Sequence, residues 1–79
     1  MNNYFIYAIK SQKDGRIYVG MSEDPDRRLS EHNAGYVKST QFYAPWSMIY
    51  KKFIGKRSEA RQEEKRLKSG FGKEFLKIL

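Results

Sequence analysis

The 79-residue sequence contains no cysteine and only one histidine. A disulfide framework, a thiolate zinc site and a metal site made of histidines alone are therefore excluded. Any metal ion that the chain holds must bind oxygen ligands, and oxygen ligands favour magnesium, with manganese as a substitute.

Long apolar runs are also lacking. The N-terminal stretch MNNYFIYAIK is too short in apolar residues for a signal peptide, and no segment approaches the ~20 apolar residues of a membrane span. The sequence thus predicts a cytoplasmic protein without a membrane partner.

The chain has the length of one domain, residues 1–79, because two cores of half this size would each bury too little apolar surface. Only 39% of the residues are hydrophobic, but five Phe, six Tyr and one Trp supply large buried areas per residue. A small, aromatic core is expected, and no internal repeat or low-complexity tract is present.

Positive charge is in excess, with 16 Lys and Arg against nine Asp and Glu and a net charge of +7. This balance favours a polyanionic partner, and nucleic acid is the first candidate. An anionic membrane, an acidic protein or simply a solvated basic surface are the alternatives that charge alone leaves open.

A β-hairpin is predicted at the N-terminus. Two runs rich in aromatic and β-branched residues, 4–10 and 16–21, flank the turn residues Asp14 and Gly15. Alternation places Tyr7 on one face of the first strand and Tyr18 and Gly20 on one face of the second. With a loop of about five residues, Tyr7 and Tyr18 should lie on the same face at nearby levels.

A helix should follow, with Asp24 as N-cap, Pro25 at its first position and Gly35 at its end. Arg28 and His32 are four residues apart and therefore share one side of this helix.

The rest of the chain predicts a connector over 36–45 that holds at most a helical turn, a third strand over 46–54, a helix over 57–69 and a short helix over 72–79. Ser58 is expected to cap the long helix and Gly70 to end it. The order ββα(α)βαα predicts an α+β fold, a three-stranded, mainly antiparallel sheet flanked by helices.

The long helix carries an anomaly in its apolar stripe. Ala60, Leu67 and Phe71 define one face, and the position between them on that face is Glu64. A carboxylate held at the sheet edge could bind magnesium, which needs only one or two protein oxygens besides water and phosphate. A solvated carboxylate paired with Arg61 or Lys68 is the structural alternative.

The tyrosines could exchange a proton with a water molecule that attacks phosphorus, although an unperturbed phenol, with a pKa of about 10, is a poor base at neutral pH. Arg28 could lower that pKa and stabilise phosphoryl charge, and His32 could accept the proton. Ordinary roles remain open: packing for the tyrosines, solvation for Arg28 and a helix-dipole contact for His32.

In combination these residues resemble the GIY-YIG nuclease family. The similarity covers nearly the whole chain, and small bacterial proteins akin to the N-terminal nuclease domain of excinuclease ABC resemble it best. It is carried by Phe5-Ile6-Tyr7, Tyr18-Val19-Gly20, the helix Pro25 to Gly35, Lys38-Ser39-Thr40, Pro45-Trp46, Glu59-Ala60 and Glu64 to Lys68.

The resemblance implies a catalytic set of Tyr7, Tyr18, Arg28, His32 and Glu64, with Glu64 as the metal ligand and Mg²⁺ as the metal. The first motif departs from the pattern at Phe5, where a glycine often stands. Many members also have an asparagine after the metal-binding glutamate, whereas residues 65–79 contain none.

The resulting expectation is a Mg²⁺-dependent DNA endonuclease with a role in repair or DNA processing and no small-molecule cofactor. Tyr7 is the preferred general base and Tyr18 the alternative. The competing hypothesis is a noncatalytic DNA-binding or partner-recruiting module that keeps the nuclease fold, and a third is a structural component of a repair complex.

Overall fold

A computed structural model describes residues 2–79 of the chain. Its strands are β1 (Tyr4–Ser11), β2 (Ile17–Ser22) and β3 (Trp46–Gly55). Its helices are α1 (Pro25–Asn33), the 3₁₀ turn η1 (Gln41–Tyr43), α2 (Arg57–Lys68) and α3 (Gly70–Lys77). The predicted α+β class and element order are confirmed.

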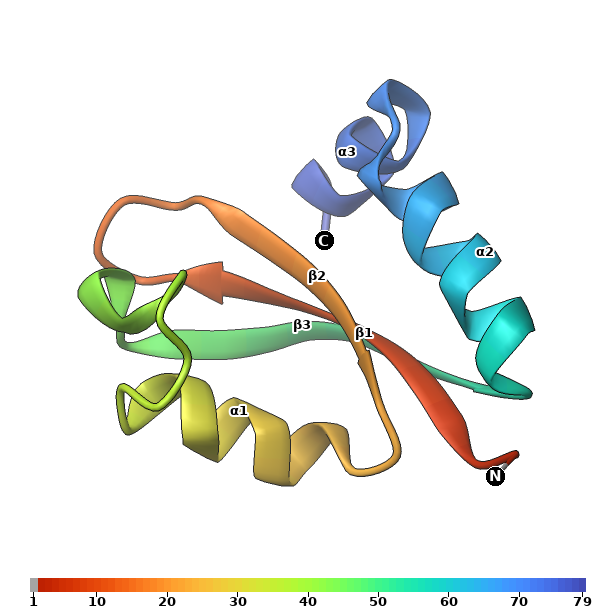
Figure 1. The fold of residues 1–79 in the computed structure, drawn as a ribbon. Helices are drawn as coiled ribbons and strands as arrows, with labels where there is room; N and C mark the ends of the chain where they lie inside the picture. The colour runs from red at the N-terminus through yellow and green to blue at the C-terminus, as the bar shows by residue number, and fades with distance from the viewer. Residues whose placement is uncertain (1) are drawn as a thin grey trace.

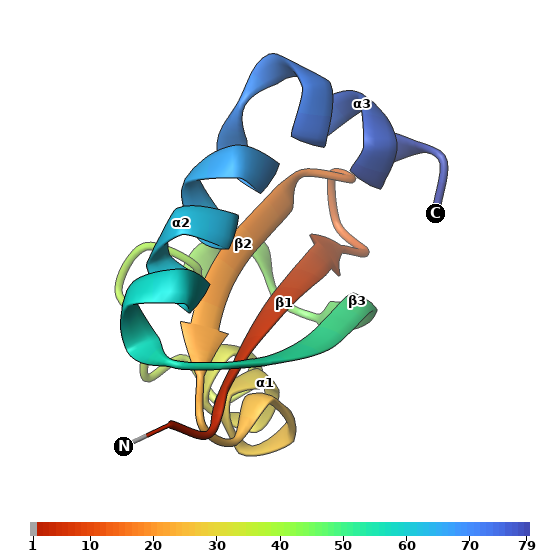
Figure 2. The ribbon, with the colours of Figure 1, turned by 90° about the vertical axis from the view of Figure 1, so that its right-hand side faces the viewer.

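The three strands form one antiparallel sheet in the order β2-β1-β3. Helix α1 covers one face, and α2 and α3 lie on the other (Figures 1 and 2). The central strand β1 is therefore buried on both sides, and its side chains divide by alternation between two apolar clusters.

The cluster beneath α2 and α3 contains Ile6 and Ala8 of β1, Val19 of β2, and Leu67 and Leu76 of the helices. The cluster on the α1 face is more aromatic. It contains Tyr7, Ile9 and Trp46, with Tyr18 and Leu29 packed against them. The two tyrosines thus share the α1 face, as the hairpin pattern predicted.

The register differs slightly from the expected one, because Tyr7 lies opposite Gly20 and Tyr18 lies opposite Ile9. A Cβ atom on Gly20 would come within 2.6 Å of the Tyr7 Oη atom. Gly20 therefore leaves the space into which the Tyr7 ring extends across β2.

Helix α1 begins and ends as predicted. The Asp24 side chain accepts a hydrogen bond from the Arg27 N–H, Pro25 occupies the first turn, and Gly35 follows the helix with a φ of +84°. A second contact fixes its far end: the Asn33 amide accepts a hydrogen bond from Trp46 N at 2.6 Å and donates one to Trp46 O at 3.1 Å.

The start of α2 was predicted wrongly. Lys56 occupies the N-cap position and makes no side-chain capping bond, while Ser58 lies within the first turn. The local signal of a serine did not outweigh the short connection from β3, which begins the helix two residues earlier than that cap would allow.

The end of α2 also differs from the prediction. The chain turns at Ser69, whose extended backbone separates the two helices, and Gly70 opens α3 instead of ending α2. This turn breaks the helical periodicity, so Phe71 leaves the stripe of Ala60 and Leu67 and is 75% exposed. Of the apolar residues expected to pack in the last helix, only Leu76 is fully buried.

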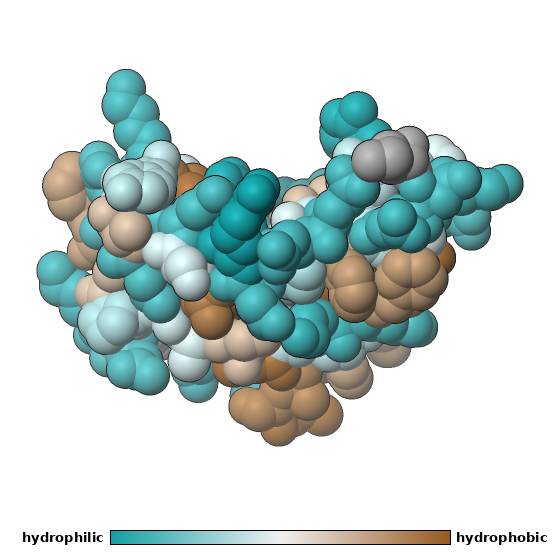
Figure 3. All heavy atoms as spheres, turned by 90° about the horizontal axis from the view of Figure 1, so that it is seen from below, coloured by the Kyte–Doolittle hydropathy of each residue, from teal (hydrophilic) through white to brown (hydrophobic). Residues whose placement is uncertain are grey.

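On the face that α1 covers, hydrophilic side chains predominate and apolar ones gather in separate smaller patches (Figure 3). Within residues 2–79, no helix combines the length and apolar character that crossing a membrane would require.

Candidate active site

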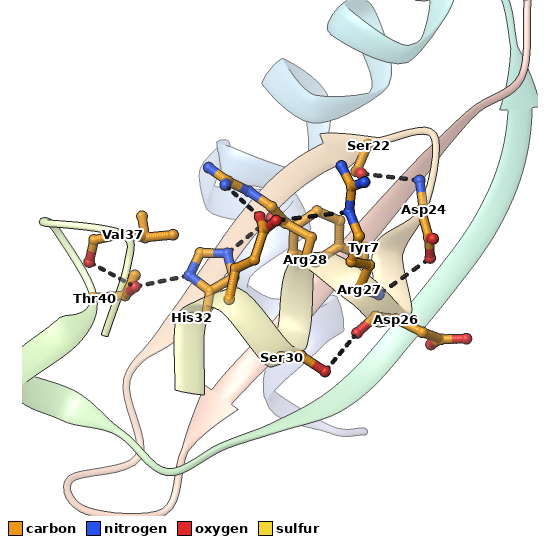
Figure 4. Close-up of polar contacts among 11 residues, drawn as sticks. Tyr7, Ser22, Asp24, Asp26, Arg27, Arg28, Ser30, His32, Val37 and Thr40 are labelled. Atoms are coloured by element: carbon orange, nitrogen blue, oxygen red, sulfur yellow. Dashed lines mark hydrogen bonds and ion pairs between the residues drawn. The ribbon is translucent and has the colours of Figure 1, made fainter. Parts of the chain in front are cut away.

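A buried hydrogen-bond chain crosses the interface between β1 and α1. The Tyr7 Oη atom lies 3.0 Å from His32 Nε2, and His32 Nδ1 lies 2.7 Å from Thr40 Oγ1. The Thr40 hydroxyl in turn donates to the Val37 carbonyl at 3.3 Å. Figure 4 shows His32 between Thr40 and Tyr7, with Arg28 projecting from the same helix.

Burial is nearly complete along this chain. Tyr7 is 1% exposed, His32 0% and Thr40 1%. Since buried polar groups destabilise a fold unless they are paired, this one histidine is held by both ring nitrogens.

Burial also controls the charge of His32. It lowers the pKa of His32 to about 4, with a further lowering by the Arg28 guanidinium, while Glu31 opposes the shift. The ring is therefore neutral at physiological pH and has one nitrogen lone pair available to accept a proton.

Tyr7 has the opposite environment from the one the sequence suggested. Arg28 acts to lower its pKa as expected, but burial, followed by the nearby Tyr18, raises the pKa of Tyr7 to about 12. Glu64 adds a smaller effect in the same direction. The phenol is thus protonated at neutral pH, and a base is needed to take its proton as it accepts another.

Arg28 lies beside this chain on α1. Its Nη1 atom is 2.9 Å from Glu31 Oε1, and its side chain is 40% exposed. The Glu31 carboxylate raises the pKa of Arg28, and the Tyr7 hydroxyl contributes to the same shift. A fixed, partly exposed guanidinium next to the buried phenol can bind a phosphate group from solution.

Tyr18 belongs to the same group through its ring, which lies edge-on to the His32 ring at a centroid distance of 4.9 Å. It is half-buried, whereas Tyr7 is covered. Of the two predicted tyrosines, Tyr7 therefore contacts the proton acceptor and Tyr18 is the more accessible to a ligand.

Glu64 reaches the site from the other layer of the fold, since α2 lies across the sheet from α1. Its side chain is 17% exposed and forms long ion pairs with Lys68 at 3.4 Å and Arg61 at 3.8 Å. The predicted pairing of this carboxylate is thus present. Its influence on the pKa of Tyr7 places its charge in the neighbourhood of the phenol.

The donor set fits a hard divalent cation that keeps most of its own water. No group of three or more His, Cys, Asp or Glu side chains within residues 2–79 forms a ready-made metal cage. A single carboxylate with loosely held partners, completed by water and substrate phosphate, is the arrangement that Mg²⁺ adopts in many phosphoryl-transfer sites.

Thr40 and Glu31 were missed as members of the site by the reasoning from sequence. Both contact a predicted residue, but Thr40 lies in an irregular connector that has no periodicity to place it. The available signal was the single histidine on a helix face, because a buried imidazole needs a partner for each nitrogen.

A tyrosine pair on a hairpin, a helix arginine beside it and a glutamate from the opposite layer define a class of catalytic domain. The chain belongs to the GIY-YIG family: the GIY-YIG catalytic domain matches residues 3–77. Membership indicates a nuclease, and a nuclease of this family implies DNA as the substrate.

Relatives of the same size are found in staphylococci. The chain is 31% identical to a UPF0213 protein of Staphylococcus saprophyticus over 80 residues, which cover 100% of this chain and 96% of that protein. It is 29% identical to a UPF0213 protein of Staphylococcus aureus strain Mu3 over the same coverage. The names of these relatives specify no activity, and no solved structure matches the chain.

Proposed function

We propose that the protein is a divalent-cation-dependent endonuclease that hydrolyses phosphodiester bonds in DNA, with Mg²⁺ as the cation and Mn²⁺ as a substitute. The observation that carries the proposal is the buried contact of 3.0 Å between Tyr7 Oη and His32 Nε2, with the Arg28 guanidinium next to it. A merely structural tyrosine does not need a neutral imidazole as its partner.

In the proposed reaction, a water oxygen attacks phosphorus and its proton passes to the Tyr7 oxygen. The proton of Tyr7 passes at the same time to His32 Nε2, so that no free phenolate has to form in a site that raises the pKa of the phenol to about 12. The bond from phosphorus to the leaving oxygen breaks, and that oxygen takes a proton from solvent.

The low pKa of His32 has a use in this scheme. An imidazolium whose pKa is about 4 releases its proton readily at neutral pH, so the base returns to its starting state after each turnover. Arg28 binds the nonbridging oxygens and Tyr18 orients the phosphate, while the approach of water to Tyr7 needs a small displacement of the side chains that cover it.

Glu64 would hold the metal ion. When bound, a divalent cation supplies Lewis-acid stabilisation of the charge that develops on phosphate, an effect of several kcal/mol. A role in DNA repair or processing is part of the proposal and is supported by the resemblance of the motifs to the N-terminal nuclease domain of excinuclease ABC.

The competing function is a noncatalytic DNA-binding or partner-recruiting module. The observation in its favour is the absence of an asparagine after Glu64 in residues 65–79, where many GIY-YIG nucleases have one. Both functions predict DNA binding, so only cleavage separates them.

The decisive experiment is cleavage of linear, nicked, flapped and branched DNA by the purified protein with Mg²⁺, with Mn²⁺ and with EDTA. Glu64→Gln should lower the rate more than about a thousandfold, because the loss of metal stabilisation by several kcal/mol corresponds to that factor. Folding should be retained, since the replaced charge strands no buried partner.

Glu63→Gln is the matched control. Glu63 is the preceding residue, its side chain is also 17% exposed, and it pairs with Arg66. This variant should cleave at the wild-type rate. Wild-type cleavage by a folded Glu64→Gln protein, or no metal-dependent cleavage of any substrate by the wild type, would favour the binding module.

A further inference from the structure

The two hydrogen bonds of His32 have a definite direction. At one end, the Thr40 hydroxyl donates its only proton to the Val37 carbonyl, so its oxygen lone pairs face His32 Nδ1 at 2.7 Å. Nδ1 must therefore carry the hydrogen and donate it to Thr40.

The other end of the ring leads to the same assignment. A guanidinium has only donors, so Arg28 can interact with the Tyr7 hydroxyl only through the lone pairs of its oxygen. The hydroxyl proton then points to His32 Nε2, 3.0 Å away, which must accept it. Both contacts require the neutral tautomer with its hydrogen on Nδ1.

Thr40 is itself held rigidly. Its carbonyl accepts a hydrogen bond from the Trp46 indole Nε1 at 3.0 Å, and its backbone N–H donates to the Val37 carbonyl at 3.1 Å. Trp46 is only 4% exposed and belongs to the apolar cluster on the α1 face. The position of the Thr40 hydroxyl is thus fixed by the core rather than by the exposed connector.

We propose that Thr40 is a positioning residue: by accepting the hydrogen of Nδ1 it fixes the tautomer of His32 and keeps the Nε2 lone pair directed at Tyr7. The consequence for DNA cleavage rests on the proposed function, whereas the tautomer itself does not. Thr40 touches neither water nor substrate in this role and acts only through His32.

Without the Thr40 hydroxyl, the Nδ1–H group would be buried without an acceptor, which is unfavourable. The ring would then shift its hydrogen to Nε2 and donate to the Tyr7 oxygen. In that tautomer His32 cannot take the proton of Tyr7, and the coupled transfer from water stops at the phenol.

The test uses the fact that the chain contains a single histidine. Protein labelled with ¹⁵N-histidine and free of any histidine tag gives one pair of ring nitrogen signals at neutral pH, and their shifts distinguish a protonated from an unprotonated nitrogen. We expect protonated Nδ1 and unprotonated Nε2 in the wild type and in Thr40→Ser, which keeps the hydroxyl.

Thr40→Val replaces the hydroxyl by a methyl group of similar size. We expect its spectrum to change to protonated Nε2 or to a mixture of tautomers. A wild type with protonated Nε2, or a Thr40→Val protein with unchanged ring signals, would overturn the proposal. The wild-type and Thr40→Ser spectra decide this even if Thr40→Val does not fold.

Cleavage provides the second readout. The kcat of Thr40→Val should fall about tenfold or more, with an unchanged KM for DNA, and Thr40→Ser should restore it. If the wild type cleaves nothing, the proposed nuclease function fails while the spectra still test the tautomer. If Thr40→Val changes tautomer and keeps full kcat, the positioning role is wrong and the nuclease function stands.

Discussion

At the scale of single residues, the site depends on what is missing at position 20. The ring of Tyr7 occupies the space above Gly20, and an added Cβ would lie 2.6 Å from its Oη, 2.8 Å from Cζ and 3.0 Å from Cε1. Because Tyr7 is buried and bonded to His32, it cannot turn away without breaking that bond.

Gly20→Ala should therefore destabilise the fold by roughly 1–3 kcal/mol, the usual cost of overpacking, and weaken the Tyr7–His32 bond. Gly70→Ala is the control, since a Cβ at Gly70 meets nothing within 4 Å. Urea denaturation measures both variants. Equal midpoints for Gly20→Ala and the wild type would mean that the ring of Tyr7 is not confined as described.

The pKa of His32 makes stability depend on pH. The folded pKa is about 4, lowered by burial and by Arg28, whereas the unfolded value is about 6.5. Between these values the unfolded chain binds the extra proton, so stability is fully present above pH 6.5 and is lost as pH falls towards 4.

We expect the wild type to lose up to roughly 2 kcal/mol between pH 7 and pH 5 through this one residue. His32→Gln should show little change over that interval, since carboxylates titrate mainly below it. Denaturant midpoints at the two pH values give the comparison. Parallel pH profiles for the two proteins would contradict a neutral buried His32.

At the scale of helices and strands, elements with local signals were predictable and junctions were not. The hairpin, α1 with its Asp24 cap and the third strand follow from alternation, turn residues and capping. The α2–α3 junction does not, because the helical period continues through Gly70 in the sequence while the backbone turns at Ser69.

The same division applies to the site. Tyr7 and Tyr18 on one face and Arg28 and His32 on one helix side follow from the period of a strand and a helix. The Thr40 contact joins a helix to an irregular connector and has no such period. The raised pKa of Tyr7 follows from burial in three dimensions, which a list of neighbouring charges in the sequence does not contain.

The junction itself leads to a prediction at this scale. Gly72 is buried where α3 folds back on α2, and a Cβ there would collide with the backbone of Leu67. Backbone is not free to move as a flexible side chain is, so the two helices must separate to admit a methyl group.

Gly72→Ala should thus destabilise the protein by roughly 1–3 kcal/mol and loosen α3, despite the better helix propensity of alanine. Gly70→Ala, two residues earlier in α3, should be neutral or slightly stabilising. Thermal unfolding of the two variants is the measurement. A Gly72→Ala protein as stable as Gly70→Ala would show that the helices can be separated at no cost.

At the scale of the whole molecule, the charge of +7 is distributed rather than concentrated in one reading helix. Lys38 in the connector, Lys56 and Arg57 at the start of α2, and Lys65 within it are all exposed. Such a distribution suits contacts with phosphates more than contacts with base edges.

DNA binding should therefore weaken steeply with salt, with a slope of log K against log salt of about −0.9 for each phosphate contacted on duplex DNA. Fluorescence anisotropy with Glu64→Gln protein in EDTA measures this without cleavage. Four contacts are a reasonable number for a protein of this size. An affinity that is flat with salt would count against nucleic acid as the partner.

The bond pair between Asn33 and Trp46 also affects how copies of the molecule meet one another. Strand β3 lies at the edge of the sheet, and an open edge can add a strand from another chain and begin aggregation. The Asn33 amide occupies both backbone polar groups of Trp46 at one end of that edge. Further along, Lys51 and Lys52 are exposed and alternate between the two faces, so an incoming strand would have to desolvate an ammonium group on either side. The same asparagine that fixes α1 to the sheet therefore helps to keep the protein from polymerising.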